Sequence, residues 1–260
     1  MELSNKLLLN MGLVAIFGGI ALGLCAAPLK AQMHGHGTSQ PPSPTEIEQL
    51  SGLNASQMSA NRSFNQGLEK LQAAKYEGAI EDFGQAIKLN PSYEDAYVNR
   101  GNIYRKLGNY QGAIADYTQA IQLNPSFTYL YNSRGNIREK LKDYKGAIAD
   151  YTEAIRLYPE ESTGYRNLGS VYYKLGDYQA ALKSLDQGVQ VNSGSAATYL
   201  KRGEIYVKLD DREKAINDFQ QAINLFSAQG NAADAQRASQ ILQELQKQSP
   251  NLRRVSGARD

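Results

Sequence analysis

The chain repeats itself at an interval of 34 residues, and this repetition restricts its fold more than any other feature. The segment YVNRGNIYRKLGNYQGAIADYTQAIQLNP at residues 97–125 returns as YNSRGNIREKLKDYKGAIADYTEAIRLYP at residues 131–159. Three columns of residues keep this register: Gly67, Gly101, Gly135, Gly169 and Gly203; Ala79, Ala113, Ala147, Ala181 and Ala215; and the large residues Phe83, Tyr117, Tyr151, Leu185 and Phe219. Five marks per column at one period indicate an array of repeated structural units.

Each unit is predicted to form two helices. Tyr97, Gly101 and Tyr104 stand at i, i+4 and i+7, which is the spacing of one helical face. Turn residues at Gly108-Asn109 interrupt this pattern, and a second helical face follows them. Pro125 ends the second helix, because proline disfavours helical geometry in the residue before it. The small residues let the two helices approach closely, and the large residue of each unit fills the space beside them.

This pattern of aromatic residue, glycine, tyrosine, alanine, large residue and proline, at a period of about 34 residues, resembles that of tetratricopeptide repeats. The sequence departs from the family pattern in having no tryptophan, and in placing Arg100, Arg134 and Arg202 where leucine usually precedes the glycine. The resemblance implies an all-α fold, a right-handed α-solenoid of five helix pairs. The five repeats are expected at residues 60–93, 94–127, 128–161, 162–195 and 196–229.

Residues 231–247 are predicted to form a helix that caps the last repeat. Ala235, Ala238 and Leu242 lie at helical spacing, and the opposite face of this segment is polar. Such a helix closes the stack with one face and meets water with the other. The polar residues 248–260, with three arginines, are predicted to be a disordered tail.

The first 31 residues have the composition of a targeting segment. Lys6 precedes an apolar run at residues 7–27, and Leu29-Lys30-Ala31 fits a signal peptidase site. The apolar run is also long enough to span a bilayer, so a retained membrane anchor is a second interpretation. Lipid modification of Cys25 is a third. Each interpretation predicts that the repeats are exported, to the periplasm or an equivalent lumen.

Residues 32–55 are polar, contain glycine and proline, and are predicted to be a flexible spacer with one helical turn at residues 45–50, capped by Ser43 or Thr45. The first repeat helix is predicted to begin near Ser56. The two histidines of the chain, His34 and His36, lie in this spacer. If the signal is cleaved as predicted, His34 becomes the third residue, and an amino-terminal amine, two amide nitrogens and an imidazole can hold copper(II) in a square plane. Cyclisation of the new terminal glutamine would remove that amine. No metal site and no other cofactor is therefore predicted.

Composition argues against a nucleic-acid-binding protein and against an enzyme. The formal net charge is only +2, which does not favour binding driven by phosphate contacts. The predicted repeats contain no histidine, no cysteine and no glycine-rich phosphate loop. Asp116 and Asp150 recur at the repeat period, so they belong to the repeat and do not form a unique acid–base pair. We therefore expect a protein without catalytic activity.

The first helix of each repeat carries a polar face opposite its buried face, at about 100° per residue. In tetratricopeptide repeat proteins this face lines the concave groove where extended peptides bind. Asparagine suits this role, because its amide offers a donor and an acceptor to a peptide backbone. A row of lysines favours acidic side chains or a carboxyl terminus on the partner. Alternatively, the lysines only stabilise helix ends, where a cation contributes about 0.3–1 kcal/mol. The candidate groove residues are Asn99, Asn102, Lys106, Asn132, Asn136, Lys140, Arg166, Asn167, Lys174, Lys201 and Lys208.

The resemblance implies a non-catalytic scaffold that binds an extended or helical segment of a partner protein outside the cytoplasm. Runs such as RGNIYRKLGNYQGAIADYTQAI are similar to those of cyanobacterial repeat proteins. A membrane-tethered assembly factor for a larger complex, photosynthetic ones included, is therefore one alternative, and self-association through the end repeats is another. The carboxylate clamp that binds chaperone tails is matched only in part, by Asn132, Asn136, Asn167 and Lys201, so a chaperone adaptor is not expected.

Overall fold

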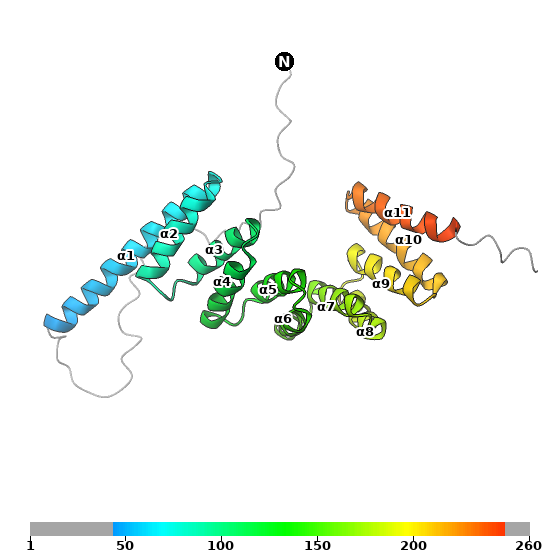
Figure 1. Cartoon of the computed structure of the whole chain (residues 1–260), viewed down its shortest axis with the longest axis horizontal. Helices are drawn as coiled ribbons and strands as arrows, with labels where there is room; N and C mark the ends of the chain where they lie inside the picture. Colours follow the sequence, from blue (N-terminus) through cyan, green and yellow to red (C-terminus); the bar gives the residue numbers. More distant parts are fainter. Residues whose placement is uncertain (1–43, 248–260) are drawn as a thin grey trace, which may run out of the picture. The chain divides into compact units, whose positions relative to one another are not determined.

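The computed structural model describes residues 44–247, which form eleven helices and no strand (Figure 1). The chain divides into two units, residues 1–47 and residues 48–260, and nearly all of the described residues belong to the second. The helices are α1 (Pro44–Gln72), α2 (Tyr76–Leu89), α3 (Glu94–Lys106), α4 (Tyr110–Leu123), α5 (Thr128–Lys140), α6 (Tyr144–Leu157), α7 (Ser162–Leu175), α8 (Tyr178–Val191), α9 (Ala196–Lys208), α10 (Arg212–Ala228) and α11 (Ala232–Lys247). Consecutive helices pair within each repeat and contact the next pair, which is the predicted all-α arrangement.

A close contact between a glycine and a large side chain joins the two helices of every repeat. In repeat three, a Cβ atom added to Gly135 of α5 would stand 2.7 Å from the ring of Tyr151 on α6. In repeat four, a Cβ atom on Gly169 would stand 2.7 Å from Leu185. Repeats one, two and five have the same contact, and the large residue of all five repeats is fully buried. The predicted close approach of the paired helices is confirmed.

The turn between the two helices of a repeat requires one residue in the left-handed conformation. Glycine adopts this conformation without steric cost, whereas other residues are strained in it. The left-handed residues and their φ angles are Ala74 (56°), Gly108 (79°), Lys142 (64°), Gly176 (80°) and Asp210 (58°). In repeats two to five the next residue caps the second helix, because its side-chain oxygen accepts a hydrogen bond from a backbone N–H three residues later. These capping residues are Asn109, Asp143, Asp177 and Asp211.

A buried ion pair also links the two helices in repeats two, three and five. Arg134 of α5 donates to Asp150 of α6 from Nε and from one terminal nitrogen, the shortest of these contacts being 2.6 Å, and the aspartate side chain is only 3% exposed. A buried charge is costly unless it is paired, so each of these arginines depends on its aspartate. Repeat one also has an aspartate at this position, Asp82, but its partner is Lys70 of α1, at 2.7 Å. The equivalent pairs are Arg100–Asp116 (2.7 Å) and Arg202–Asp218 (2.8 Å).

The arginine of repeat three extends this link to the repeat before it. One guanidinium nitrogen of Arg134 donates to the hydroxyl of Thr118 on α4, at 2.9 Å, so one side chain joins three helices. Repeat four has Leu168 and Ser184 where the arginine and aspartate stand in its neighbours. The Ser184 hydroxyl donates to the carbonyl of Ala180 within its own helix. Repeat four therefore holds its helices together without a buried ion pair at this place.

Helix α1 is longer than the sequence analysis predicted. A flexible spacer with only one helical turn was expected at residues 32–55, with the repeat helix beginning near Ser56, but α1 continues back to Pro44, so the prediction of a spacer is wrong from Pro44 onward. Proline is tolerated in the first turn of a helix, because its missing N–H would have no intrahelical partner there. The Ser56 hydroxyl donates to the carbonyl of Leu89, the last residue of α2, at 2.9 Å. The part of α1 before Ser56 therefore extends beyond the end of α2.

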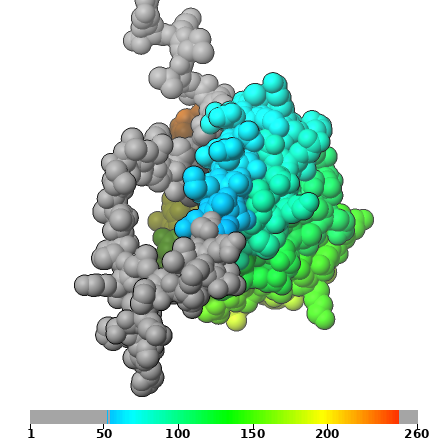
Figure 2. Space-filling view, turned by 90° about the vertical axis from the view of Figure 1, so that its left-hand side faces the viewer, coloured from blue at the N-terminus to red at the C-terminus, as the bar shows by residue number. Residues whose placement is uncertain are grey.

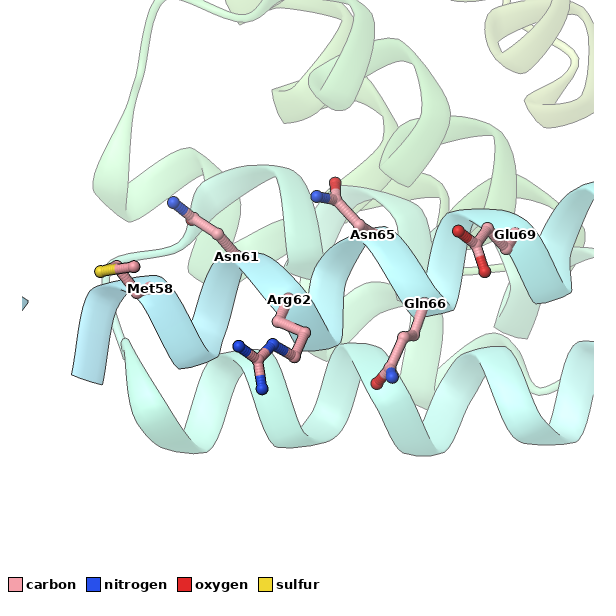
Figure 3. Close-up of a pocket in the computed structure, with 6 residues that line it drawn as sticks. All are labelled: Met58, Asn61, Arg62, Asn65, Gln66 and Glu69. Atoms are coloured by element: carbon pink, nitrogen blue, oxygen red, sulfur yellow. The ribbon is translucent and has the colours of Figure 1, made fainter. Parts of the chain in front are cut away.

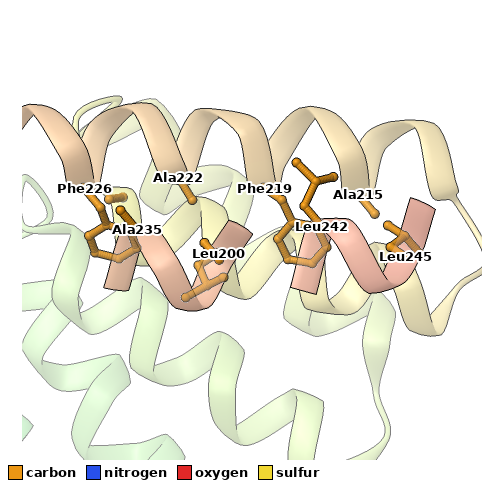
Figure 4. Close-up of a cluster of buried hydrophobic side chains, with 10 residues drawn as sticks. Leu200, Ala215, Phe219, Ala222, Phe226, Ala235, Leu242 and Leu245 are labelled. Carbon is orange, nitrogen blue, oxygen red and sulfur yellow. The ribbon is translucent and has the colours of Figure 1, made fainter. Parts of the chain in front are cut away.

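The last helix, α11, covers the apolar face of α10. Ala238 and Leu242 of α11 belong to one buried cluster with Phe219 and Phe226 of α10 (Figure 4). The Asn231 side chain accepts a hydrogen bond from the backbone of the first turn of α11. The segment predicted to cap the repeats thus forms a helix whose apolar side is buried and whose other side is largely exposed.

Several predictions concern residues that lie outside the described part of the chain. These are the targeting segment at residues 1–31, the two histidines of the spacer, and the tail at residues 248–260. Among the helices between residues 44 and 247, none combines the length and apolar character needed to cross a membrane.

Candidate functional site

The candidate groove residues lie on α3, α5, α7 and α9, the first helices of repeats two to five. In each of these helices the buried glycine faces the second helix of its own repeat. In repeats two and three the next residue is an asparagine, Asn102 or Asn136, which stands at the edge of that contact. A side chain at this position can therefore reach both its own repeat and the following one.

Asn102 receives two hydrogen bonds from tyrosines on different helices. Its amide oxygen accepts from the hydroxyl of Tyr117 on α4, at 2.7 Å, and from the hydroxyl of Tyr129 on α5, at 2.6 Å. A carbonyl oxygen has two lone pairs, so both bonds are satisfied. Tyr117 is buried, whereas Tyr129 is 50% exposed. These bonds orient the amide with its oxygen toward the tyrosines, and its NH₂ group has no partner among the described residues.

Asn136 forms the corresponding contact in repeat three and extends it to repeat four. Its oxygen accepts from the hydroxyl of Tyr151, at 2.7 Å, and from the amide nitrogen of Asn167 on α7, at 3.2 Å. Two of the predicted asparagines are thus in direct contact across neighbouring repeats. The oxygen of Asn167 has no hydrogen-bond partner within residues 44–247.

Glu139 is a central member of this face that the sequence analysis missed. One of its carboxylate oxygens lies 2.9 Å from the Tyr151 hydroxyl. The other lies 2.8 Å from the ammonium group of Lys174 and accepts a hydrogen bond from Ser170. Burial raises the pKa of Tyr151, and the Glu139 carboxylate raises it further. Glu139 stands three residues after Asn136, on the same helix face, and this spacing was the signal that could have identified it.

The predicted lysines do not form one uniform row. The ammonium group of Lys106 lies 4.6 Å from the ring centre of Tyr76, and that of Lys140 lies 4.9 Å from the ring centre of Tyr110. Each of these tyrosines begins the second helix of the preceding repeat. A cation over an aromatic face is attractive, so these two lysines contribute to packing between repeats. For them, the structure favours a stabilising role.

The other three lysines have different surroundings. Lys174 is paired with Glu139, and Lys201 is paired with Glu204 one turn later on α9, at 2.7 Å. Lys208 is exposed and makes no ion pair with any described residue. Two of these three cations are therefore already neutralised by a carboxylate of the same face.

Three further candidates have separate environments. Asn99 donates from its amide nitrogen to the carbonyl of Asp95 within α3, at 2.8 Å, so it bonds to its own helix. Asn132 is buried, and its amide oxygen lacks a partner among the described residues. Arg166 is partly buried, and burial lowers its pKa from the usual arginine value.

A hollow of about 560 Å³ lies along α1 and not along the predicted groove face (Figure 3). All its lining side chains project from this one helix and are exposed, so the described residues form no closed wall around it. Its residue Glu69 stands 34 positions before Ile103, which is buried. No earlier repeat among the described residues covers this side of α1, and polar residues fit that exposure. Figure 2 shows the surface of α1 in blue beside that of α2 in cyan. The lining residues are Met58, Asn61, Arg62, Asn65, Gln66 and Glu69.

Family models match almost all of the helical repeats. A tetratricopeptide repeat model matches residues 94–127, a TPR repeat model matches residues 67–108 and 135–176, and a further tetratricopeptide repeat model matches residues 161–228. Together they extend from α1 to the end of α10 with one short gap. The chain is a tetratricopeptide repeat protein. The five-repeat solenoid expected from the sequence is therefore supported by both the family models and the helix arrangement.

Solved structures of other proteins share this fold. The crystal structure of MamA protein is 20% identical, with a TM-score of 0.61, and the match covers 67% of this chain and 95% of MamA. YrrB, described as a TPR protein with an unusual peptide-binding site, is 21% identical, with a TM-score of 0.57 and coverage of 75% and 96%. PilF of Pseudomonas aeruginosa is 19% identical, with a TM-score of 0.55 and coverage of 75% and 95%. At these identities the likeness establishes the fold. No curated protein sequence matches the chain.

Proposed function

We propose that this tetratricopeptide repeat protein is a non-catalytic scaffold that binds an extended or helical segment of a partner protein on its first helices. The observation that carries the proposal is the set of anchored amides at Asn102, Asn136 and Asn167. Buried tyrosine hydroxyls hold the oxygens of Asn102 and Asn136. The described residues leave the NH₂ group of Asn102 and the oxygen of Asn167 free to bond with a peptide backbone.

Anchoring matters because binding has an entropic cost. A side chain that is mobile before binding must be immobilised, at about 0.5–1.5 kcal/mol for each one. Tyr117 and Tyr151 are fully buried, and their hydroxyls order Asn102 and Asn136 before a partner binds. YrrB, a protein of similar fold, is described as having a peptide-binding site, which supports peptide binding by this fold. The proposal needs neither a cofactor nor a catalytic step.

The location of the protein is a second part of the proposal. The composition of residues 1–31 favours export to the periplasm or an equivalent lumen, with the partner met there. If residues 7–27 are retained, the alternative is a membrane-tethered assembly factor for a larger complex. Mass spectrometry of the native protein distinguishes the two. Cleavage gives a chain beginning near residue 32 in the soluble fraction, and retention gives a membrane-bound chain that includes residues 7–27.

The binding proposal is tested with a variant that changes the amides and keeps their anchors. In Asn102→Asp/Asn136→Asp, a carboxylate oxygen can still accept from the tyrosine, whereas the NH₂ donors are lost. Pull-down from membrane and soluble fractions is expected to recover a partner with the wild type and to lose it with this variant. Asn217→Asp is a matched control, because Asn217 is exposed on α10, a second helix. Recovery of the same partner by the folded double variant would refute the proposal.

A further inference from the structure

Arg166 differs from the other partly buried arginines on the first helices of the repeats. The arginines of repeats two, three and five each bind an aspartate of the second helix, and Arg138 also binds Asp150, at 2.8 Å. Arg166 is partly buried on α7, yet it makes no ion pair and no hydrogen bond from its side chain with any residue between 44 and 247. It thus carries a charge that this part of the chain does not neutralise.

The fold does not require a charge at this position. The equivalent residues of the other repeats are Phe64, Val98, Asn132 and Leu200, all of them uncharged. The arginines that pair with aspartate stand at the position that Leu168 occupies in repeat four, and Arg166 lies two residues before that position. The arginine therefore does not replace the structural ion pair. It introduces a cation at a place where the other repeats have none.

The surroundings of Arg166 make this cation costly. Burial lowers its pKa, against the opposing effects of Glu161 and Tyr151. Glu139, the carboxylate of the groove face on α5, is already paired with Lys174. A partly buried charge without a partner destabilises a folded protein. Such costs persist where they serve binding.

We propose that Arg166 binds the carboxylate of an aspartate or glutamate side chain in the segment that the groove holds. This inference rests on the proposed function and specifies the chemistry of the partner. A planar guanidinium has five N–H donors and can bind a carboxylate through two parallel hydrogen bonds. Candidate groove residues lie in the repeats on both sides, Asn136 in repeat three and Lys201 in repeat five. A partner chain can therefore continue past Arg166 in both directions, which favours a side chain over a chain terminus.

The first test separates a binding arginine from a structural one. Arg166→Met is compared with Arg134→Met by thermal denaturation followed by circular dichroism. Arg134→Met is expected to lower the midpoint strongly, because it leaves Asp150 buried without its main partner. Arg166→Met is expected to keep the midpoint or raise it, because it removes an unpaired charge. A loss in Arg166→Met as large as that in Arg134→Met would show that Arg166 supports the fold, and would overturn the inference.

The second test measures binding to an array of short peptides of randomised sequence, each made once with a capped and once with a free carboxyl terminus. The wild type is expected to select peptides with Asp or Glu at one position, and replacement of that residue by Asn or Gln should weaken binding about tenfold. Arg166→Gln should bind the acidic and the neutral peptides equally. Arg237→Gln, which changes an exposed arginine of α11, should keep the wild-type preference.

The outcomes distinguish this inference from the proposed function. If the wild type binds peptides without an acidic preference, or if Arg166→Gln keeps that preference, the inference fails while the groove remains a peptide-binding site. If only peptides with a free carboxyl terminus bind, Arg166 recognises a chain end and the inference is again wrong. If no peptide binds to the wild type, the proposed function fails and the inference fails with it.

Discussion

Repeat three, at residues 128–161, joins its helices through Arg134 and Asp150, whereas repeat four, at residues 162–195, has Leu168 and Ser184 at the same places. The two repeats nevertheless have the same pair of helices, with the same close contact at the glycine column. The fold therefore requires the shape of this interface and accepts either a polar or an apolar filling.

The two repeats also differ beside the candidate site. Tyr151 of repeat three reaches Asn136 and Glu139 with its hydroxyl, whereas Leu185 of repeat four fills the same space and has no polar atom to offer. Asn167 of repeat four instead bonds to the asparagine of repeat three. The polar filling of repeat three thus orients the candidate binding residues, and the apolar filling of repeat four does not.

The largest expected effect is the loss of the buried ion pair of repeat three. Asp150→Ala should lower the free energy of unfolding by about 3–5 kcal/mol, because it removes one partner of a buried pair. Arg134, the partner left behind, has a side chain only 11% exposed. Urea denaturation followed by circular dichroism measures the change. Glu153→Ala, which removes the exposed pair with Arg156, should have little effect and serves as the control.

A double variant that copies repeat four sharpens this prediction. Arg134→Leu/Asp150→Ser removes both charges, so it should recover most of the stability that Asp150→Ala loses. Arg138, which also binds Asp150, is 24% exposed, so water reaches part of its side chain in the double variant. A double variant as unstable as Asp150→Ala would show that the unpaired Arg134 is not the cause.

The glycine contact should have the next largest effect. Gly135→Ala should cost about 1–3 kcal/mol, because the added Cβ would overpack the buried ring of Tyr151. Gly169→Ala should cost a similar amount, because its Cβ would stand 2.7 Å from Cγ of Leu185 and 3.2 Å from the backbone carbonyl oxygen of Ala181. Gly52→Ala of α1, where a Cβ meets nothing within 4 Å, is the control and should not destabilise. A loss at only one of Gly135 and Gly169 would contradict the close contact that the two repeats share.

The effect expected to be next in size is a loss of stability of repeats two and three at alkaline pH. Burial raises the pKa of Tyr117 and of Tyr151, so the folded protein favours their neutral forms. The contribution of these two tyrosines to the free energy of unfolding is complete below the ordinary tyrosine pKa of about 10. It is lost as the pH rises above that value toward the higher pKa of the folded protein. At about pH 11 each tyrosine should cost roughly 1 kcal/mol.

Tyr151→Phe isolates this effect from the titration of other groups. Unfolding midpoints of the wild type and the variant are compared between about pH 8 and about pH 11. The wild type should lose more stability over this range, because the phenylalanine cannot ionise. Repeat four, with Leu185, has no such group at this position. Identical losses in both proteins would show that Tyr151 does not titrate as predicted.

The smallest expected effect concerns the turns. Lys142 of repeat three adopts a φ of 64°, whereas repeat four has glycine at the same position, Gly176, with a φ of 80°. Lys142→Gly should raise the free energy of unfolding by up to about 1 kcal/mol, because glycine is not strained in this conformation. Gly176→Lys should lower it by a similar amount. Thermal midpoints measure both changes, and the pair would contradict the prediction if the signs were reversed.

Several parts of the fold could be read from residues that recur. The spacing of Gly135 and Tyr151 predicted a close helix contact, and the structure has it. The buried ion pairs were missed, because Arg134 and Asp150 lie on different helices and single-helix periodicity does not relate them. Their joint recurrence in repeats two, three and five was the available signal. The continuity of α1 from Pro44 was also missed, because the helical turn expected at residues 45–50 is followed by a polar stretch with no apolar period to join it to the repeat helix.

The sequence by itself determined the repeat length, the helix pairs and the family of this protein, because apolar periodicity and turn residues act over a few neighbouring positions. Only the tertiary structure decided which polar groups are already engaged. It placed Lys106 and Lys140 over tyrosines, bonded Asn102 to Tyr117, and gave Arg166 no carboxylate partner among residues 44–247. The physical reason is that each of these contacts joins different helices or repeats. Their distances depend on how the helices stack, which no local pattern records.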